Sequence, residues 1–320
     1  GSVYPVAINI PQIFDSHPDK DPRKLGAYIS WVAIATTCIT SSMFLTALAP
    51  NLLAVDLIAK TSGHVITWGE WAGVMLALMV PLFLLTPWLA YVIYPPTQKK
   101  SPEAPAWAAE ELKTLGAITF KEYLMAGLAT VALILWIFNQ EFGLDSTTVA
   151  IAIVSIMVLA NIITWDDLIS NKAAFNVLIW FASLVAMASG LQKVGVLAWI
   201  GANTQELLSG MSPTTLMLSL LILFFLLHYF FASVTAHVTA LIPIFMAIAV
   251  NLLTPEQIVP FTIILAGSLG VMGIITPYAT GPSPIWYGAG YISQGRWWAL
   301  GAIFGVLYLG VIILGAFIFI

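Results

Sequence analysis

Charged residues are scarce in this chain. Asp, Glu, Lys and Arg make up 8% of its 320 residues, about a third of their share in an ordinary soluble domain. Too few polar residues therefore remain to cover a soluble surface. The single cysteine, Cys38, excludes a secreted module held together by disulfides. A formal net charge of −4 without a basic stripe argues against nucleic-acid binding.

Hydrophobic residues, in contrast, make up 60% of the chain and gather in long runs. No strand-length alternation of apolar and polar residues appears, so these runs predict helices. We therefore expect an all-α polytopic membrane protein. The expected spans are Ala27–Ile58, broken near its middle, Trp71–Tyr94, Glu122–Asn139, Thr147–Ile163, Ala173–Leu191, Thr214–Leu253, Gln257–Tyr291 and Trp297–Ile320, with an interfacial helix at Gly195–Leu208.

Lys and Arg concentrate in two loops, residues 12–26 and 95–121. Two crossings separate these loops, so both lie on one side of the membrane, and their basic character makes that side cytoplasmic. The same alternation places Arg296 inside and the C-terminus outside. Gly1-Ser2 is followed at once by an apolar stretch, so we expect a fragment that lacks its N-terminal half and does not transport alone.

Two of the apolar runs are interrupted by small polar residues and prolines, at residues 40–51 and 276–284. Unpaired amides in hydrocarbon cost several kcal/mol each, so such backbone must line a polar cavity or pack against protein. A single interruption is explained better by a kink. A pair in corresponding positions points to a transporter's binding site near the bilayer midplane.

Each interruption is preceded by another interrupted apolar element. Before the second interruption this element carries Ser233-Val234-Thr235 and ends at Pro243. Before the first, only residues 1–10 remain, with Pro5 in a similar setting, and the counterpart of Ser233 falls upstream of Gly1. The orientation count indicates that the two elements enter the membrane from opposite sides.

The stretches SSMFLTALAPN (41–51), FASVTAHVTALIP (231–243) and ITPYATGPSPIWYGAGYIS (275–293) resemble the divalent anion/sodium symporter superfamily. The resemblance covers the whole chain and is strongest to the bacterial citrate/succinate and tartrate/succinate antiporters and the plastid 2-oxoglutarate/malate translocators. It implies an inverted-repeat elevator transporter in the bacterial inner membrane, usually a homodimer. It also implies re-entrant hairpins and unwound helices around a di- or tricarboxylate such as citrate, tartrate, succinate, malate or 2-oxoglutarate.

This resemblance implies a division of the chain. The expected parts are the remainder of the first hairpin (1–14), a broken helix of the transport domain (27–59), scaffold helices (68–140) with a cytoplasmic loop (95–121), scaffold or arm helices (147–210), the second hairpin (214–255), a second broken helix (257–293) and a last transmembrane helix (297–320).

The resemblance also implies which residues contact the substrate. They are the hydroxyl, amide and unwound-backbone positions of the quoted motifs: Ser41, Ser42, Thr46, Asn51, Ser233, Thr235, Thr276, Thr280, Gly281 and Pro282. In the family each hairpin tip carries Ser-Asn-Thr, whose Asn helps to hold sodium, whereas Val234 stands at this position here. The family's Gly-Thr-Pro-Pro-Asn reads Ala47-Leu48-Ala49-Pro50-Asn51, so the register of the first interruption departs from the pattern.

A doubly negative substrate needs compensation inside the membrane. Helix N-termini supply amides and about half an elementary charge each, and Ser and Thr hydroxyls add neutral donors. His237, one turn beyond Ser233, can supply a positive charge, although a histidine here can equally well satisfy a backbone carbonyl. A sodium site, if present, lies near Ala232, Val234 and Ala279; because Val234 offers no ligand, we favour exchange without sodium and expect no cofactor.

Three other functions compete with exchange. A sodium-coupled dicarboxylate symporter is the alternative within transport, since an intact sodium site could lie in the missing tip. An intramembrane enzyme would need a nucleophile with a base or a set of metal ligands at depth, and no such motif is found, so we expect no enzyme. A channel would explain the polar interruptions but not a site built from two hairpins.

Overall fold

The computed structural model describes residues 3–100, 102, 104–172 and 210–319, together with isolated positions between 173 and 209. Every regular element in this described part is a helix, as the sequence predicts. The predicted span Ala173–Leu191 and the interfacial helix Gly195–Leu208 fall where only isolated positions are described.

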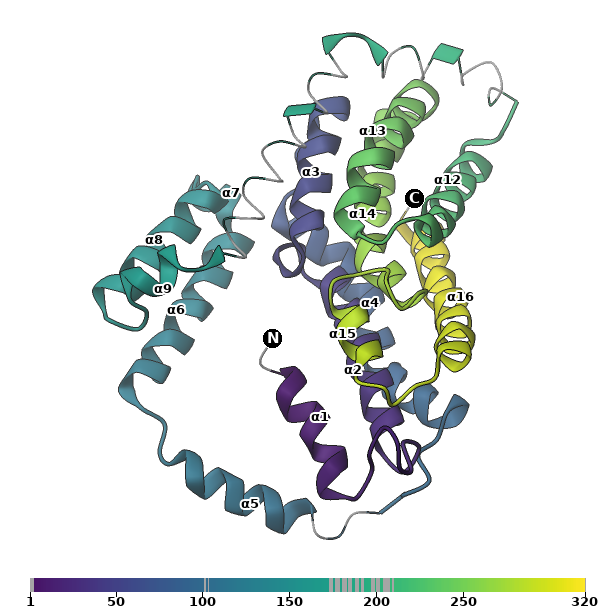
Figure 1. Ribbon diagram of the computed structural model, residues 1–320. Coiled ribbons are helices and arrows are strands. Elements are labelled where there is room, and N and C mark those ends of the chain that lie inside the picture. The colour runs from purple at the N-terminus through teal and green to yellow at the C-terminus, as the bar shows by residue number, and fades with distance from the viewer. Residues whose placement is uncertain are drawn as a thin grey trace. The chain divides into compact units, whose positions relative to one another are not determined.

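The chain divides into two compact units, Gly1–Gln98 with Phe181–Ile320 (unit 1) and Lys99–Trp180 (unit 2). The helices of unit 1 are α1 (Val3–Ile13), α2 (Gly26–Met43), η1 (Leu45–Ala47), α3 (Ala49–Ser62), α4 (Trp68–Ile93), α12 (Pro213–Leu227), η2 (His228–Phe230), α13 (Val234–Leu252), α14 (Pro255–Val271), η3 (Met272–Ile274), α15 (Pro282–Gly288) and α16 (Gln294–Phe319) (Figure 1). Unit 2 holds α5 (Ala104–Leu115), α6 (Phe120–Ile137), α7 (Asn139–Phe142), α8 (Ser146–Leu159) and α9 (Trp165–Ile169).

Six helices in the described part are long and apolar enough to cross a membrane: Trp68–Ile93, Phe120–Ile137, Pro213–Phe230, Val234–Leu252, Pro255–Ile274 and Gln294–Phe319. Their positions agree with the predicted apolar runs. The predicted loop 95–121 differs, because α5 forms within it. Its sequence APAWAAEELKTL is rich in strong helix formers, which explains a helix inside a polar connection.

Both predicted interruptions are present. Helix α2 stops at Met43, Phe44 and Leu48 adopt extended backbone on either side of η1, and α3 begins with a proline in its first turn. Helix α14 stops at Val271, and after η3 the chain stays unwound to the start of α15 at Pro282. This second interruption begins earlier than the predicted Thr276, since Gly270 and Gly273 weaken the helix before the threonine is reached.

The two broken helices run in opposite directions. Figure 1 shows α2 and α15 in the lower half of unit 1 and α3 and α14 in its upper half. Helix α3 packs along α13, and α14 packs along α2. Tyr4 of α1 contacts Trp286 of α15, with ring centroids 4.9 Å apart. Each broken helix is followed by a helix of 26 residues, α4 or α16, so the order of elements recurs.

Helices α2 and α14 cross at Gly270. A β-carbon at this position would lie 2.6 Å from Ser42 Oγ and 2.7 Å from the Cys38 carbonyl oxygen. The Val271 N–H donates to Ser42 Oγ over 2.9 Å. Ser42 and Gly270 each stand one residue before the last residue of their helix, so the crossing brings the two interruptions together.

Side chains of α4 and α16 donate hydrogen bonds to backbone carbonyls of α2. The Trp71 indole N–H donates to the Ser42 carbonyl over 3.1 Å. The buried Tyr308 hydroxyl donates to the Ala35 carbonyl over 3.4 Å and lies 3.3 Å from Thr86 Oγ1. Helix α4 thus belongs to the same compact unit as the broken helices, and the boundary between the two units falls after Gln98. The assignment of residues 68–140 to the scaffold stays a prediction.

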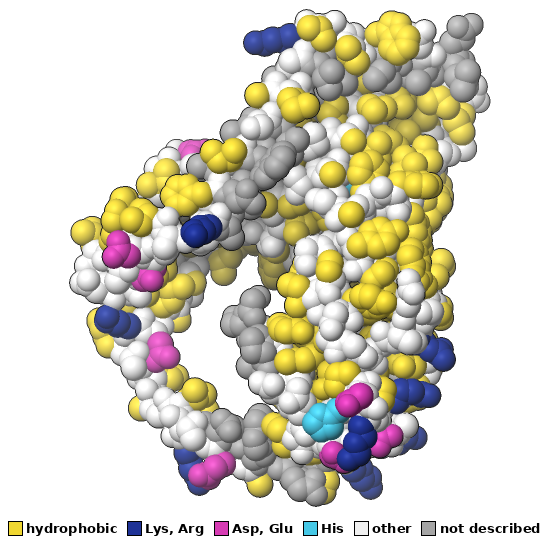
Figure 2. All heavy atoms as spheres, viewed as in Figure 1, with side chains coloured by type: hydrophobic (Ala, Val, Ile, Leu, Met, Phe, Trp, Pro, Cys, Tyr) yellow, Lys and Arg dark blue, Asp and Glu magenta, His cyan; other side chains and the backbone are white. Residues whose placement is uncertain are grey.

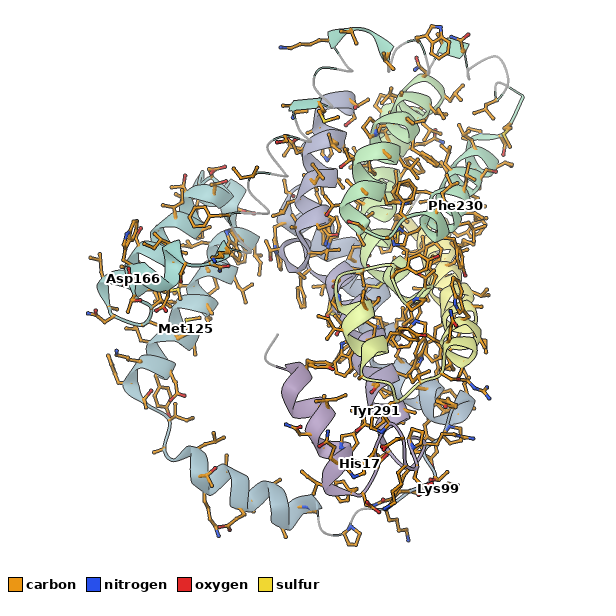
Figure 3. All side chains as sticks on the ribbon, viewed as in Figure 1. His17, Lys99, Met125, Asp166, Phe230 and Tyr291 are labelled. Carbon is orange, nitrogen blue, oxygen red and sulfur yellow. The ribbon has the colours of Figure 1, made fainter. Side chains whose placement is uncertain are left out.

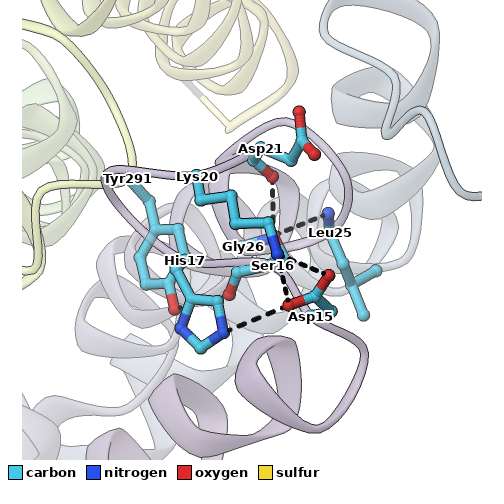
Figure 4. A network of polar contacts seen from close by, with 8 residues as sticks. All are labelled: Asp15, Ser16, His17, Lys20, Asp21, Leu25, Gly26 and Tyr291. Carbon is cyan, nitrogen blue, oxygen red and sulfur yellow. Dashed lines mark hydrogen bonds and ion pairs between the residues drawn. The ribbon is translucent and has the colours of Figure 1, made fainter.

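The loop before α2 is tied to the loop before α16 (Figure 4). Ser16 Oγ donates to the Asp21 carbonyl over 3.0 Å and accepts from the N–H groups of Leu25 and Gly26 over 3.2 and 3.1 Å, which caps the start of α2. The Tyr291 hydroxyl donates to the Ser16 carbonyl over 3.1 Å, and its ring covers Gly26.

An exposed ion pair lies on the same loop. Lys20 Nζ is 3.1 Å from the Asp15 carboxylate and holds the pKa of Asp15 below its usual range. Figure 3 labels His17 of this loop and, near it, Tyr291.

The loop before α2 and the segment after α4, up to Gln98, lie together at one end of unit 1. The N–H groups of Thr97 and Gln98 donate to the carbonyls of Arg23 and Lys24 over 3.0 and 3.1 Å. The guanidinium carbons of Arg23 and Arg296 lie 4.9 and 5.3 Å from the centre of the Tyr94 ring. Figure 2 shows charged side chains gathered at this lower end, with hydrophobic side chains over the helices above it. Arg296 therefore lies at the same end of unit 1 as Arg23 and Tyr94, and the cytoplasmic placement of this end stays a prediction.

We expect Gly270→Ala to lower the free energy of unfolding by about 1–2 kcal/mol, because the added methyl overpacks the crossing by more than the gain in helix propensity. Thermal unfolding in detergent measures the effect. Gly310→Ala is the matched control, since a β-carbon there meets no atom within 4 Å. A Gly270→Ala protein as stable as the Gly310→Ala protein would contradict the close crossing.

We expect Ser16→Ala to cost about 1 kcal/mol of stability, because it removes the cap of α2. The same unfolding measurement applies, with Ser155→Ala as the control. Ser155 is exposed on α8 and bonds only to a carbonyl of its own helix. Equal unfolding midpoints for the two variants would show that the Ser16 hydroxyl stabilises nothing.

Candidate functional site

The predicted substrate-contacting residues lie at three interruptions of unit 1. We name these the first break (residues 44–48), the tip (residues 228–233) and the second break (residues 272–281). None of these three segments contains Asp, Glu, Lys or Arg. Each therefore offers a bound molecule only backbone groups, hydroxyls and histidine rings.

At the first break, Asn51 bridges the ends of the two helices. Its side-chain amide donates to the Ser41 carbonyl over 2.8 Å and to the Phe44 carbonyl over 3.4 Å. Its Oδ1 atom is buried and has no hydrogen-bond partner among the described residues. Thr46 is exposed on η1, whereas Ser42 is buried in the crossing and accepts from Val271. Asn51 thus keeps a free acceptor beside the break.

At the tip, the hydroxyl side chains stand where α13 begins. Ser233 has extended backbone, and its Oγ accepts weakly from the Ala236 N–H over 3.5 Å. Thr235 is half-buried in the first turn, and its hydroxyl makes no hydrogen bond within the described part of the chain. Since α13 is 19 residues long, its N-terminal amides add positive partial charge at these hydroxyls.

The second break folds back on η3. The buried Thr276 accepts the Tyr278 N–H on Oγ1 over 3.4 Å. Ser283 Oγ donates to the Gly273 carbonyl over 3.2 Å, and the Ser283 N–H donates to the Thr280 carbonyl over 3.0 Å. Sequence reasoning missed Ser283, although it stands between two prolines in the quoted motif. The two hydrogen bonds of Ser283 join the start of α15 to residues 273 and 280 of the second break.

Two hydrogen bonds join the tip to the second break. His228 Nε2 lies 2.9 Å from the Ala279 carbonyl oxygen, and because a carbonyl only accepts, this nitrogen carries the hydrogen. The Tyr278 hydroxyl donates to the Tyr229 carbonyl over 3.1 Å. Neither His228 nor Tyr278 is among the predicted site residues, and from the sequence alone His228 is interpreted as structural. The neighbouring Phe230, labelled in Figure 3, is 84% exposed.

His237 lies fully buried beneath the tip. Its ring centroid is 4.3 Å from that of Phe224, 5.0 Å from that of Phe231 and 4.8 Å from that of His228. Neither ring nitrogen has a partner among the described residues. The His228 ring thus connects the His237 ring to the second break.

The two breaks also meet each other. A β-carbon on Gly273 would lie 2.9 Å from Thr280 Cγ2 and 3.3 Å from Cys38 Sγ. The second break therefore packs against α2, the helix that ends at the first break. The structure brings Ser42, Thr280 and the tip into one region of unit 1, with α3 running along α13.

The residues expected near a sodium ion, Ala232, Val234 and Ala279, have no side-chain oxygen. Val234 is buried and apolar, and Ala232 is exposed. The Ala279 carbonyl already accepts from His228. The described residues contain no group of three or more His, Cys, Asp or Glu that could hold a metal ion. Among the described residues, the buried Oδ1 of Asn51 is a hard oxygen ligand without a hydrogen-bond partner.

Comparison with known proteins gives the family. The sequence model of the family described as "sodium:sulfate symporter transmembrane region" matches residues 1–319. The chain is 45% identical over 316 residues to the L-tartrate/succinate antiporters of Escherichia coli (strain K12), Shigella boydii serotype 4 (strain Sb227) and Shigella flexneri. Each match covers 98% of this chain and 64% of the relative, so the chain spans less than two-thirds of these proteins. The chain therefore belongs to the sodium:sulfate symporter family.

Proposed function

We propose that this chain supplies the binding site of a secondary transporter that exchanges di- or tricarboxylates, of the tartrate and succinate class, across a bacterial inner membrane. The observation that carries the proposal is the meeting of the tip with two broken helices inside an apolar helical unit. The antiporter relatives support the same function. Because family and relatives are transporters, they agree with the expectation that the chain is not an enzyme.

The site binds carboxylates with neutral donors. Helices α3 and α13 both begin at an interruption and lie side by side, so their N-terminal amides favour negative charge there. Ser233, Thr235, Thr46 and Thr280 add hydroxyls. One carboxylate lies between the tip and the second break, and the other lies at the first break. Neutral donors release the substrate more readily than a buried arginine pair would.

The net charge of the substrate requires a further contribution. With no Lys or Arg at the interruptions, His237 is the residue that we assign to charge compensation. Its unpartnered ring under the tip supports this role. A carrier that holds an uncompensated cation when empty resists crossing without an anion, which favours obligatory exchange over net transport.

Sodium coupling is the second candidate, and one observation favours it. The buried Oδ1 of Asn51 lacks a hydrogen-bond partner among the described residues, and an unsatisfied buried acceptor costs about 1–3 kcal/mol. A sodium ion at the first break would satisfy this atom. The position of Val234 at the tip favours the sodium-free mechanism.

The arrangement of elements supports an inverted-repeat elevator transporter. The two broken helices run in opposite directions, and each is followed by a long helix. We propose that unit 1 moves as the transport domain and that unit 2 contributes to the scaffold and to a homodimer contact. Unit 2 buries few of its own apolar side chains, which suits a surface covered by lipid or a partner. The basic end of unit 1 faces the cytoplasm, and the C-terminus lies outside.

Exchange by the complete protein that carries this chain tests the function. We expect proteoliposomes loaded with succinate to take up labelled succinate in sodium-free buffer. We also expect His237→Gln to slow this exchange, because glutamine cannot carry the compensating charge. Exchange that appears only when sodium is added would instead establish the symporter. Absence of exchange in both buffers would refute carboxylate transport.

The hydroxyl of Thr235 is expected to contact the substrate. Thr235→Val keeps the shape but removes the donor, so KM for succinate should rise about tenfold or more, as expected for a lost hydrogen bond to a charged group. Thr130→Val on the exposed surface of α6 is the matched control. An unchanged KM in the Thr235→Val protein would remove Thr235 from the site.

A further inference from the structure

The tip and the second break hold each other through bonds in both directions. His228 of η2 donates to the carbonyl of Ala279 in the second break. Tyr278 of the second break donates to the carbonyl of Tyr229 in η2. We call these four residues the clasp. Because each segment supplies one side chain and one carbonyl, neither segment can shift along or rotate against the other without breaking a bond.

The bond from His228 also sets the direction of the next amide. A peptide unit is planar and trans, so its N–H points opposite to its C=O. With the Ala279 carbonyl directed at His228, the Thr280 N–H is directed away from the hairpin. Within the described part of the chain neither the Thr280 N–H nor the Gly281 N–H has a hydrogen-bond acceptor. The clasp thus presents free donors next to the Thr280 hydroxyl.

We infer that His228 is a positioning residue for carboxylate binding. Its hydrogen bond keeps the Ala279–Thr280 peptide in the orientation in which the amide and hydroxyl of Thr280 face the substrate. The inference rests on the proposed function. Tyr278 supports the same orientation from the other side of the clasp.

A histidine suits this position because of its surroundings. The His228 ring is fully buried, where a permanently charged donor would carry a large desolvation cost. A neutral imidazole donates one hydrogen bond without a net charge. Its Nδ1 has no partner among the described residues, so the contact with Ala279 is the polar role that the structure assigns to this side chain.

The test compares two substitutions of His228 in the complete protein. His228→Gln places an amide N–H at about the reach of Nε2, whereas His228→Asn is too short to reach Ala279. We expect His228→Asn to raise KM for succinate exchange about tenfold, with the maximal rate within about twofold of wild type. We expect His228→Gln to restore most of the affinity. Tyr278→Phe should raise KM about threefold, and Tyr123→Phe on the exposed surface of α6 serves as its control.

Binding is measured separately by the rise in unfolding temperature on adding succinate. A smaller rise for His228→Asn than for His228→Gln supports the inference. A lower unfolding temperature with an unchanged KM would show a merely structural role and overturn it. If His228→Asn does not fold, Tyr278→Phe decides, and an unchanged KM there overturns the inference. If the wild-type protein does not exchange succinate, the proposed function itself is refuted. This outcome differs from failure of the inference, which appears only as a difference between the variants and an active wild type.

Discussion

Backbone amides and carbonyls inside an apolar helical unit must find partners, and this constraint governs the arrangement of the structure. Each broken helix gives up hydrogen bonds at a depth where hydrocarbon cannot replace them. The replacements come from side chains: Asn51 bridges the first break, Ser283 closes the second, and Ser42 joins α2 to α14. Within the described part of the chain the Thr280 and Gly281 N–H groups have no acceptor, and together with the positive ends of α3 and α13 they are the groups that we propose to bind an anion.

Side chains also satisfy backbone carbonyls between the tip and the second break. His228 and Tyr278 link the tip to the second break through carbonyls that would otherwise lack partners. The ring nitrogens of the buried His237 beneath them make no hydrogen bond to any residue that the structure describes. The first break, the tip and the second break contain no Lys or Arg, so in the proposed site the charge of a carboxylate is met by partial charges, hydroxyls and the His237 ring rather than by a salt bridge.

Much of the fold could be predicted because its signals are local. The apolar runs predict α4, α6 and α16 within a few residues, and the interruptions at 40–51 and 276–284 follow from Ser, Thr and Pro in those runs. Helix α5 was missed because a polar connection with prolines gave no reason to expect one, although its twelve residues favour a helix. That α4 lies in one compact unit with the broken helices could not be predicted, since an apolar span does not reveal which helices it packs against.

The sequence by itself determined the membrane class, the positions of the spans and breaks, and a family whose motifs contain the hydroxyls of the site. Composition and spacing suffice for these features because they depend on hydrophobicity and backbone preference over short stretches. Only the tertiary structure decided that Ser42 supports a helix crossing, that His228 rather than His237 touches the second break, and that Ser283 closes it. Such roles depend on contacts between residues up to 229 positions apart, and no local pattern encodes which carbonyl a buried side chain will meet.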